Sequence, residues 1–295
     1  MITKDYLLKA MDKDKMVRIN IAHTTALVEE AHSRHDTSAT ASAALGRVLT
    51  AALLMGSDLK NEQDALTLRI NGDGPGGPIV ATVDSHGHGR GFISNPHADL
   101  PSRHPGKLAV GELVGRNGYL EVIRDTGMKQ PFIGRVNLVS GEIAEDLTSY
   151  FLLSEQIPAL VALGVLVDTD ISVKAAGGLI VQALPGAQDA VLERLENNIL
   201  SLNSISDIMA RSQDLESVLK TLTGDRGYDI IGQSPLAFRC TCDRERLAII
   251  LANLSREELE KTAEPTGKLE VTCNFCGEVY HYDWMEIEDW KKQKP

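Results

Sequence analysis

The sequence has few aromatic residues, no cysteine before position 240 and no long apolar run. Phe, Tyr and Trp together make up 4% of the 295 residues, which predicts a mainly aliphatic core. The longest apolar run, IPALVALGVLV, is too short to span a bilayer and contains Pro158. Charged residues recur throughout MITKDYLLKAMDKDK, which excludes the apolar region of a secretory signal peptide. We therefore expect a cytoplasmic protein without a membrane segment.

Basic residues are also in deficit. The chain has 30 Lys and Arg against 41 Asp and Glu, a formal net charge of −11. Nucleic acids and anionic membranes are bound by positive patches, so we expect neither as a partner. The apolar content of 43% is ordinary for a globular protein, and the length allows one large domain plus a small one.

The first two-thirds of the chain mixes strand and helix patterns. Apolar and polar residues alternate in DALTLRI, and short glycine-containing turns separate several such segments, which predicts antiparallel strands. Two helices are also predicted, in TSATASAALGRVLTAALLMGSDL, with apolar residues on nearly every side, and in EIAEDLTSYFLLSEQ. Residues 1–185 are therefore predicted to form an α+β domain, a large antiparallel sheet with helices. The other predicted strands lie in PIVATVD, RGFIS, GRNGYLEVIRD, PFIGRVNLV and ALGVLVDTDISVKAAGGLIVQAL.

A helical segment follows PGAQD at 185–189. Between 190 and 222, apolar residues recur at helical spacing on otherwise polar helices, and such narrow stripes need a packing partner to be stable. We predict a helical linker over 186–233 and a small cysteine-bearing domain over 234–295. The apolar positions of the linker are Val191, Leu195, Ile199, Leu202, Ile205, Ile208, Met209, Leu215, Val218, Leu219 and Leu222.

All four cysteines lie in two short segments, FRCTC at 238–242 and CNFCG at 273–277. In a reducing compartment, paired cysteines indicate a metal site or a redox centre. Structural Zn²⁺ binds four thiolates in a tetrahedron. We predict one Zn²⁺ per chain, bound by Cys240, Cys242, Cys273 and Cys276, with Gly277 taking the positive φ of a tight turn.

The predicted small domain has few large apolar side chains, so the metal is expected to supply the missing free energy, about 10–16 kcal/mol. Its segment REELEKTAEPTGKLEV is predicted to form a short helix, a turn and a strand that ends at Cys273. Each cysteine pair is close enough in sequence to form its own disulfide, and a disulfide sulfur cannot serve as a thiolate ligand. Oxidation is therefore expected to eject zinc and loosen the domain.

The same residues allow two other functions. A zinc ribbon could dock on nucleic acid or a translation factor, but no basic stripe surrounds the cysteines. A thiol oxidoreductase using Cys273 and Cys276 should have its motif at the start of a helix, whereas CNFCGEVYHYD continues as turn and strand. His281 is left out of the metal site because four thiolates complete a tetrahedron.

Two further motifs indicate no function. The pair His86 and His88 is interpreted as a solvated glycine turn with no acidic partner nearby. The segment NGDGPGGP lacks the lysine of a phosphate-binding loop and is interpreted as a hairpin turn. No catalytic grouping is found, so we expect no enzyme.

The two cysteine motifs, together with TASAALGRVLTAALLMG, FISNP, SEQIP and AAGGLIVQALPG, resemble the heat shock protein 33 family of redox-regulated holdase chaperones. The resemblance covers essentially the whole chain. It implies a reduced, zinc-bound, inactive monomer and an oxidised, zinc-free homodimer that holds unfolding client proteins without ATP. It further implies disulfides between Cys240 and Cys242 and between Cys273 and Cys276, and loosening of the segment before the zinc domain.

Overall fold

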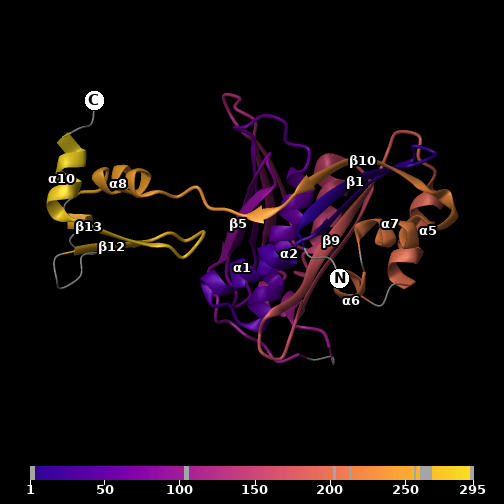
Figure 1. Cartoon of the computed structure of the whole chain (residues 1–295), viewed down its shortest axis with the longest axis horizontal. Coiled ribbons are helices and arrows are strands. Elements are labelled where there is room, and N and C mark those ends of the chain that lie inside the picture. Colours follow the sequence, from indigo (N-terminus) through magenta and orange to yellow (C-terminus); the bar gives the residue numbers. More distant parts are fainter. Residues whose placement is uncertain are drawn as a thin grey trace. The chain divides into compact units, whose positions relative to one another are not determined.

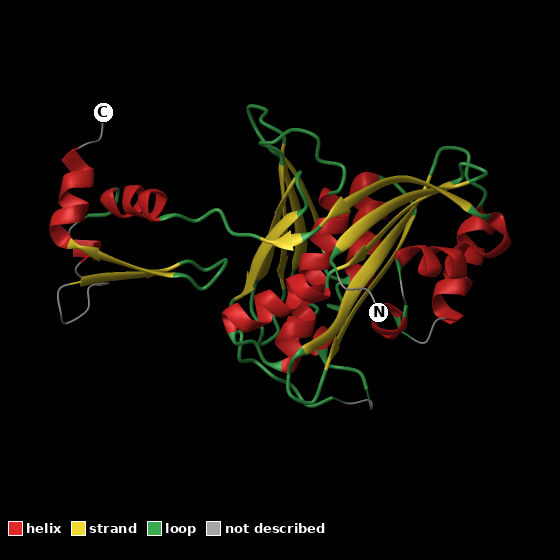
Figure 2. Cartoon of the chain, viewed as in Figure 1, coloured by secondary structure: helices red, strands yellow, loops and turns green. Residues whose placement is uncertain are grey.

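The structure is a computed structural model that describes residues 4–102, 106–201, 204–212, 214–255, 257–259 and 268–292. The chain divides into two compact units, residues 1–239 and residues 240–295 (Figure 1). The larger unit combines two β-sheets with helices, and the smaller unit has a two-stranded sheet and helices (Figure 2). The predicted α+β class is confirmed.

The first sheet of the larger unit has five antiparallel strands in the order β10-β1-β2-β9-β8. Successive residues of a strand face opposite sides of the sheet, so Leu7 and Leu8 of β1 belong to two different apolar clusters. Both faces of this sheet are therefore covered. The strands are β1 (Tyr6–Asp12), β2 (Val17–His23), β8 (Ala159–Val167), β9 (Val173–Ala183) and β10 (Tyr228–Pro235).

The second sheet has six strands in the order β11-β5-β4-β3-β6-β7. Its pairs are antiparallel except that β11 lies parallel to β5. The segment NGDGPGG joins two antiparallel neighbours, which confirms its interpretation as a hairpin turn. The strands are β3 (Ala65–Asn71), β4 (Ile79–Asp84), β5 (His88–Ile93), β6 (Tyr119–Asp125), β7 (Phe132–Asn137) and β11 (Ala237–Phe238).

The second helix, α2, lies between the two sheets and contacts strands of both (Figure 1). The Ser38 side chain caps its start by accepting the N–H of Ala41. Every residue from Thr40 to Gly56 except Arg47 is buried, as the all-round apolar pattern predicts. By length and composition alone this helix could cross a membrane, but 89% of its apolar window is buried inside the protein. The helices of the larger unit up to residue 155 are α1 (Thr25–His35), α2 (Ala39–Gly56), α3 (Val110–Val114), α4 (Ala144–Tyr150) and the π-helical turn η1 (Phe151–Glu155).

Three helices cover the other face of the five-stranded sheet: α5 (Asp189–Ser201), α6 (Ile205–Arg211) and α7 (Leu215–Thr223) (Figure 1). Their apolar stripes pack on strand residues such as Leu8 and Leu179. The short 3-10 turn η2 (Gly224–Arg226) then leads into β10. The helical prediction for 190–222 is confirmed in the described residues, and Leu202 lies outside them. The predicted stripe residues buried in this cluster are Val191, Leu195, Ile205, Met209, Leu215, Val218, Leu219 and Leu222.

The smaller unit has its own apolar cluster, which is small. Among the described residues of this unit, helix α8, the hairpin and helix α10 bury a few side chains in common, including Leu251, Leu269 and Tyr282, with Trp284 and Trp290 packed against them. The expected strand before Cys273 is present, whereas most of the helix and turn expected over 256–267 lies outside the described residues. The elements are α8 (Arg244–Ala252), β12 (Lys268–Thr272), β13 (Val279–Asp283) and α10 (Trp284–Lys292).

The boundary between the compact units falls after Arg239. The segment 186–233 lies within the larger unit, and its last residues form β10 instead of a helix, because they pair with β1. The functional division into a core (1–185), a linker (186–233) and a switch domain (234–295) stays a prediction.

Candidate metal centre

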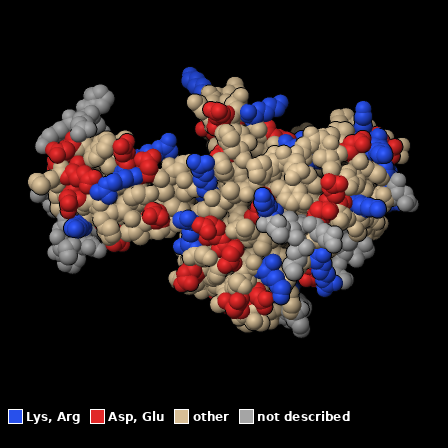
Figure 3. All heavy atoms as spheres, in the orientation of Figure 1, with Lys and Arg blue, Asp and Glu red and all other residues tan. Residues whose placement is uncertain are grey.

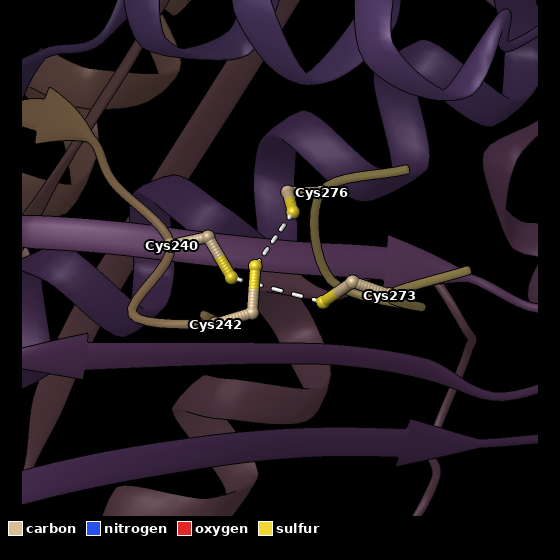
Figure 4. A group of neighbouring side chains, drawn as sticks. All are labelled: Cys240, Cys242, Cys273 and Cys276. Atoms are coloured by element: carbon tan, nitrogen blue, oxygen red, sulfur yellow. Dashed lines mark hydrogen bonds between the residues drawn. The ribbon is translucent and has the colours of Figure 1, made fainter. Parts of the chain in front are cut away.

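Two segments of the smaller unit carry the four cysteines. Cys240 and Cys242 lie in an extended stretch before α8, and Cys273 and Cys276 lie in the turn between β12 and β13 (Figure 4). The extended stretch ends at Asp243, whose carboxylate caps α8 by accepting the N–H of Arg246 at 2.8 Å. The cap fixes the start of the helix at Arg244, two residues after Cys242.

Backbone hydrogen bonds fold the second segment around its own sulfurs. The N–H of Gly277 donates to the carbonyl of Cys273 at 2.8 Å, and the N–H of Cys273 donates to the carbonyl of Glu278 at 2.9 Å. Gly277 has a φ of 71°, the left-handed region that favours glycine, which confirms the expectation for this position. The turn therefore presents two thiols from one hairpin end.

All four sulfurs converge. Each lies within 4.8 Å of the others, with Cys242 and Cys276 at 3.3 Å and Cys240 and Cys273 at 3.8 Å (Figure 4). Four thiolates bound to Zn²⁺ at about 2.3 Å lie about 3.8 Å apart in a tetrahedron. The four thiols thus fit one zinc ion, and Cys273 and Cys276 are buried where solvent does not compete.

Ionisation of all four thiols together requires a compensating cation. Burial raises the pKa of Cys276 strongly and that of Cys240 as well. Burial also acts on Cys242, but hydrogen bonds from the Tyr280 hydroxyl, 3.4 Å away, and from the other thiols outweigh it and lower the pKa of Cys242. Four thiolates this close repel one another, so full ionisation requires a compensating positive charge, which a divalent metal supplies.

Tyr280 of β13 is the contact to the thiols that the sequence analysis missed. It lies four positions beyond Cys276, and its hydroxyl reaches Cys242 from the other cysteine segment. Only the fold brings these positions together. His281, next to it, is not part of the cluster: its ring lies 3.8 Å from Glu270 on the neighbouring strand, in agreement with leaving it out.

The turn from β12 to β13 also bears on the oxidoreductase alternative. Cys273 and Cys276 lie between two strands, and no helix begins at either residue. A dithiol of the thioredoxin kind depends on a helix N-terminus to activate its first cysteine. The observed placement is typical of a metal-binding turn instead.

One expectation about the histidine pair is wrong. Asp84, at the end of β4, lies beside both rings, with its Oδ2 at 3.0 Å from Nδ1 of His88. The acidic partner that the sequence analysis found missing is therefore present. Among the described residues, Asp84, His86 and His88 form the one further group whose ligand atoms gather within 4.8 Å.

Comparisons with known proteins agree with the fold and the cysteine cluster. The family model described as Hsp33 protein matches residues 5–283. A 33 kDa chaperonin from Desulforamulus reducens is 46% identical over 97% of this chain and 96% of its own length. A 33 kDa chaperonin from Geobacillus kaustophilus is 42% identical over 98% of both chains.

A solved structure agrees as well. The crystal structure of the 33 kDa chaperonin (heat shock protein 33 homolog) from Thermotoga maritima superposes with a TM-score of 0.90 at 37% identity, and 98% of each chain is covered. Sequence, fold and cysteine arrangement thus lead to the same assignment, and the chain belongs to the Hsp33 family of chaperones.

Proposed function

We propose that this chain is a redox-regulated, ATP-independent holdase chaperone whose four cysteines form the switch. The observation that carries the proposal is the convergence of all four thiols of the chain in a small unit with few buried apolar side chains. Such a unit depends on its metal for stability, so a change at the sulfurs becomes a change in folding.

In the reduced form, Cys240, Cys242, Cys273 and Cys276 bind one Zn²⁺ per chain. The ion neutralises the thiolates and cross-links two segments about thirty residues apart, which is worth about 10–16 kcal/mol in small zinc peptides. This form is inactive because the apolar stripes of α5, α6 and α7 pack on one face of the five-stranded sheet and cover it.

Oxidation converts each cysteine pair to a disulfide. A thiolate attacks one oxygen of hydrogen peroxide and becomes a sulfenic acid, while the other oxygen leaves as hydroxide and takes up a proton from solvent to give water. The second thiol of the pair then forms the S–S bond by displacing the sulfenic hydroxyl group, which leaves with the thiol proton as a second water. One peroxide is reduced for each disulfide formed. We assign Cys240–Cys242 and Cys273–Cys276 as the pairs on the family resemblance. The contacts at 3.3 and 3.8 Å each join a cysteine of one motif to a cysteine of the other, so distance alone does not select the pairs.

Zinc leaves because the disulfide sulfurs are no longer thiolate ligands. The smaller unit then unfolds. The strands that precede it in sequence, β10 and β11, loosen together with the linker helices α5, α6 and α7. Uncovered apolar surface binds unfolding clients, because exposed apolar side chains are what non-native proteins share. The same surface brings two oxidised chains together as a homodimer.

We further propose that the protein acts in the cytoplasm, without enzymatic turnover and without nucleic acid or membrane as a partner. On the face shown in Figure 3, acidic and basic side chains are interspersed, so neither sign forms a continuous field. This distribution, with the net charge of −11, gives the zinc-ribbon alternative no basic surface on that face.

The test is to treat the reduced, zinc-loaded chain with peroxide and follow zinc release, disulfide pairing by peptide mapping, and suppression of client aggregation. We expect all three changes to occur together and to reverse with reductant and zinc. Zinc release without a gain in holdase activity would contradict the proposal, as would predominantly crossed disulfides for the assigned pairs.

A further inference from the structure

A second group of metal-ligating side chains lies in the larger unit, in the turn from β4 to β5. Its sequence, DSHGH, places Asp84, His86 and His88 at alternate positions. Each offers one ligand atom, and these three atoms lie within 4.8 Å of one another. The group shares no residue with the four thiols and has a different donor chemistry, two imidazoles and a carboxylate.

The carboxylate of Asp84 organises the group. Its Oδ1 accepts the backbone N–H groups of His86 at 2.9 Å and His88 at 3.0 Å, so both histidines are held to one side of the turn. Its Oδ2 lies 3.0 Å from Nδ1 of His88, and Nδ1 of His86 lies 4.0 Å from Oδ1. The two rings stack with 16° between their planes.

These distances suit a shared cation. Ligands at about 2.1 Å from a metal lie about 3.0–3.4 Å from one another in octahedral or tetrahedral geometry. A carboxylate has about four lone-pair positions, so Asp84 retains acceptor capacity beyond its bonds to the backbone. The His86 ring, whose Nδ1 is 4.0 Å from Oδ1 of Asp84, has to move closer, and that side chain is 54% exposed.

The turn itself is held in place by the end of the larger unit. The carbonyl of Gly87 accepts the N–H of Ala237 at 3.1 Å, and the carbonyl of Gly89 accepts the N–H of Arg239 at 3.0 Å. A Cβ at Gly87, whose φ is 79°, would lie 2.3 Å from the carbonyl oxygen of Pro235. The two histidines are therefore mounted on a fixed backbone, which reduces the ordering that a metal must impose.

We propose that Asp84, His86 and His88 form a second metal site, which binds a borderline divalent transition metal such as Zn²⁺, Ni²⁺ or Co²⁺ weakly and exchangeably. Imidazole and carboxylate ligands together select such ions over Mg²⁺ and Ca²⁺, which require oxygen ligands throughout. The site supplies three protein ligands and is open to solvent, so water completes the coordination. The thiol centre, by contrast, closes around its ion with four protein ligands.

The experiment is a calorimetric titration of the reduced, zinc-loaded full-length chain with Ni²⁺, with released zinc measured by elemental analysis of the protein-free filtrate. We expect one equivalent of Ni²⁺ to bind without zinc release. Replacing both rings, in His86→Ala with His88→Ala, should weaken this binding by about tenfold or more. The exposed His97 provides the control, since His97→Ala removes an imidazole outside the cluster and should leave Ni²⁺ binding unchanged.

Equal Ni²⁺ affinity in the wild type and the double variant would overturn the proposal, as would Ni²⁺ uptake matched by zinc release. If the double variant loses zinc from the thiol centre, the single variant His86→Ala decides. It removes an exposed ring without a buried contact and should still reduce Ni²⁺ affinity. The result does not depend on chaperone activity, so the two proposals can fail separately.

Discussion

Cys273 shows how much one side chain contributes at the metal centre. It is buried, its sulfur contacts Cys240 of the other segment, and its backbone accepts and donates the hydrogen bonds that close the turn. Replacing sulfur by oxygen keeps the turn but removes a thiolate, because a serine hydroxyl is not ionised at neutral pH.

We expect Cys273→Ser to weaken zinc binding by about hundredfold or more, since the four thiolates of the proposed site would share about 10–16 kcal/mol of binding free energy. Competition with a chromophoric chelator under reducing conditions measures this change. Asn274→Ser is the matched control, because it alters an exposed residue of the same turn and leaves all four thiols. Tight, stoichiometric zinc in the Cys273→Ser protein would refute the ligand assignment.

Glu142 illustrates a charge used for stability in the larger unit. Its carboxylate lies 2.9 Å from Arg47 of α2 and 3.1 Å from Lys107. Burial raises the pKa of Glu142, but the two cations outweigh burial and leave that pKa below its usual value. A lowered folded-state pKa contributes stability that is present above the unfolded-state pKa and is lost as pH falls through the folded-state value.

We therefore expect Glu142→Gln to lower the free energy of unfolding by about 1–2 kcal/mol at pH 7. The difference from the wild type should shrink as pH falls below about 4.3, the usual pKa of an unfolded glutamate. Urea unfolding followed by circular dichroism between pH 7 and pH 3 tests both statements. Glu145→Gln, an exposed neighbour, should change little at any pH. A difference that stays constant with pH would show that the ion pairs are not its source.

At the scale of elements, helix α6 packs directly against a glycine of the five-stranded sheet. Gly164 of β8 is paired with Gly177 of β9, and a Cβ at Gly164 would lie 2.3 Å from Cγ2 of Ile205 and 2.6 Å from the backbone nitrogen of Ser206. The backbone nitrogen cannot move without moving the helix. Close packing of α6 on the sheet therefore depends on this glycine.

We expect Gly164→Ala to displace α6 at a cost of about 1–3 kcal/mol, to raise hydrogen exchange over 205–211, and to give holdase activity without oxidant. Gly232→Ala is the control, since its nearest contact is an ordinary 3.9 Å to Lys9. Wild-type exchange over 205–211 would show that the sheet accommodates the methyl group. Raised exchange without activity would show that α6 does not mask client-binding surface.

The elements also show which parts of the fold follow from local pattern. Helix α2, the strands between 65 and 137 and the apolar stripes over 190–222 agree with their sequence patterns, because each is marked by its own periodicity. The patterns predict no strand over 6–23 or 228–238. Residues 228–235 read YDIIGQSP, mostly exposed, and they become a strand because β1 offers an edge to pair with.

The same distinction holds for the two sites. The thiol cluster follows from spacing, since cysteine is rare and all four residues lie in two motifs. The contacts of Tyr280 with Cys242 and of Asp84 with His88 depend on how a hairpin folds, and short-range turns containing Asp and His are too common to indicate a ligand by themselves.

For the whole molecule, the proposed redox switch predicts two levels of order after oxidation. Hydrogen exchange should rise sharply over 190–222 and 234–295, because the linker helices have narrow apolar stripes and the described residues of the smaller unit form only a small apolar cluster, which the proposed zinc ion would stabilise. The strands over 65–94 should stay protected, since they pack on the buried helix α2.

Mass spectrometry before oxidation, after oxidation and after re-reduction with zinc measures this pattern, and the re-reduced sample serves as the control. If residues 190–222 remain as protected as the strands in a fully active oxidised sample, that segment does not transmit the switch. If hydrogen exchange rises only over 234–295, the conformational change is limited to the smaller unit and the few residues before it.

The placement of the two tryptophans gives the molecule a built-in optical reporter. Trp284 and Trp290 are the only tryptophans in the sequence, and both belong to α10 of the smaller unit. Tryptophan fluorescence, excited at a wavelength that tyrosine does not absorb, therefore reports on that unit alone. Its emission maximum should shift to longer wavelength when the packing of α10 is lost. This fluorescence can be recorded in a stopped-flow instrument together with light scattering from an aggregating client. The two signals would show whether the smaller unit opens before the client is bound, without any attached dye.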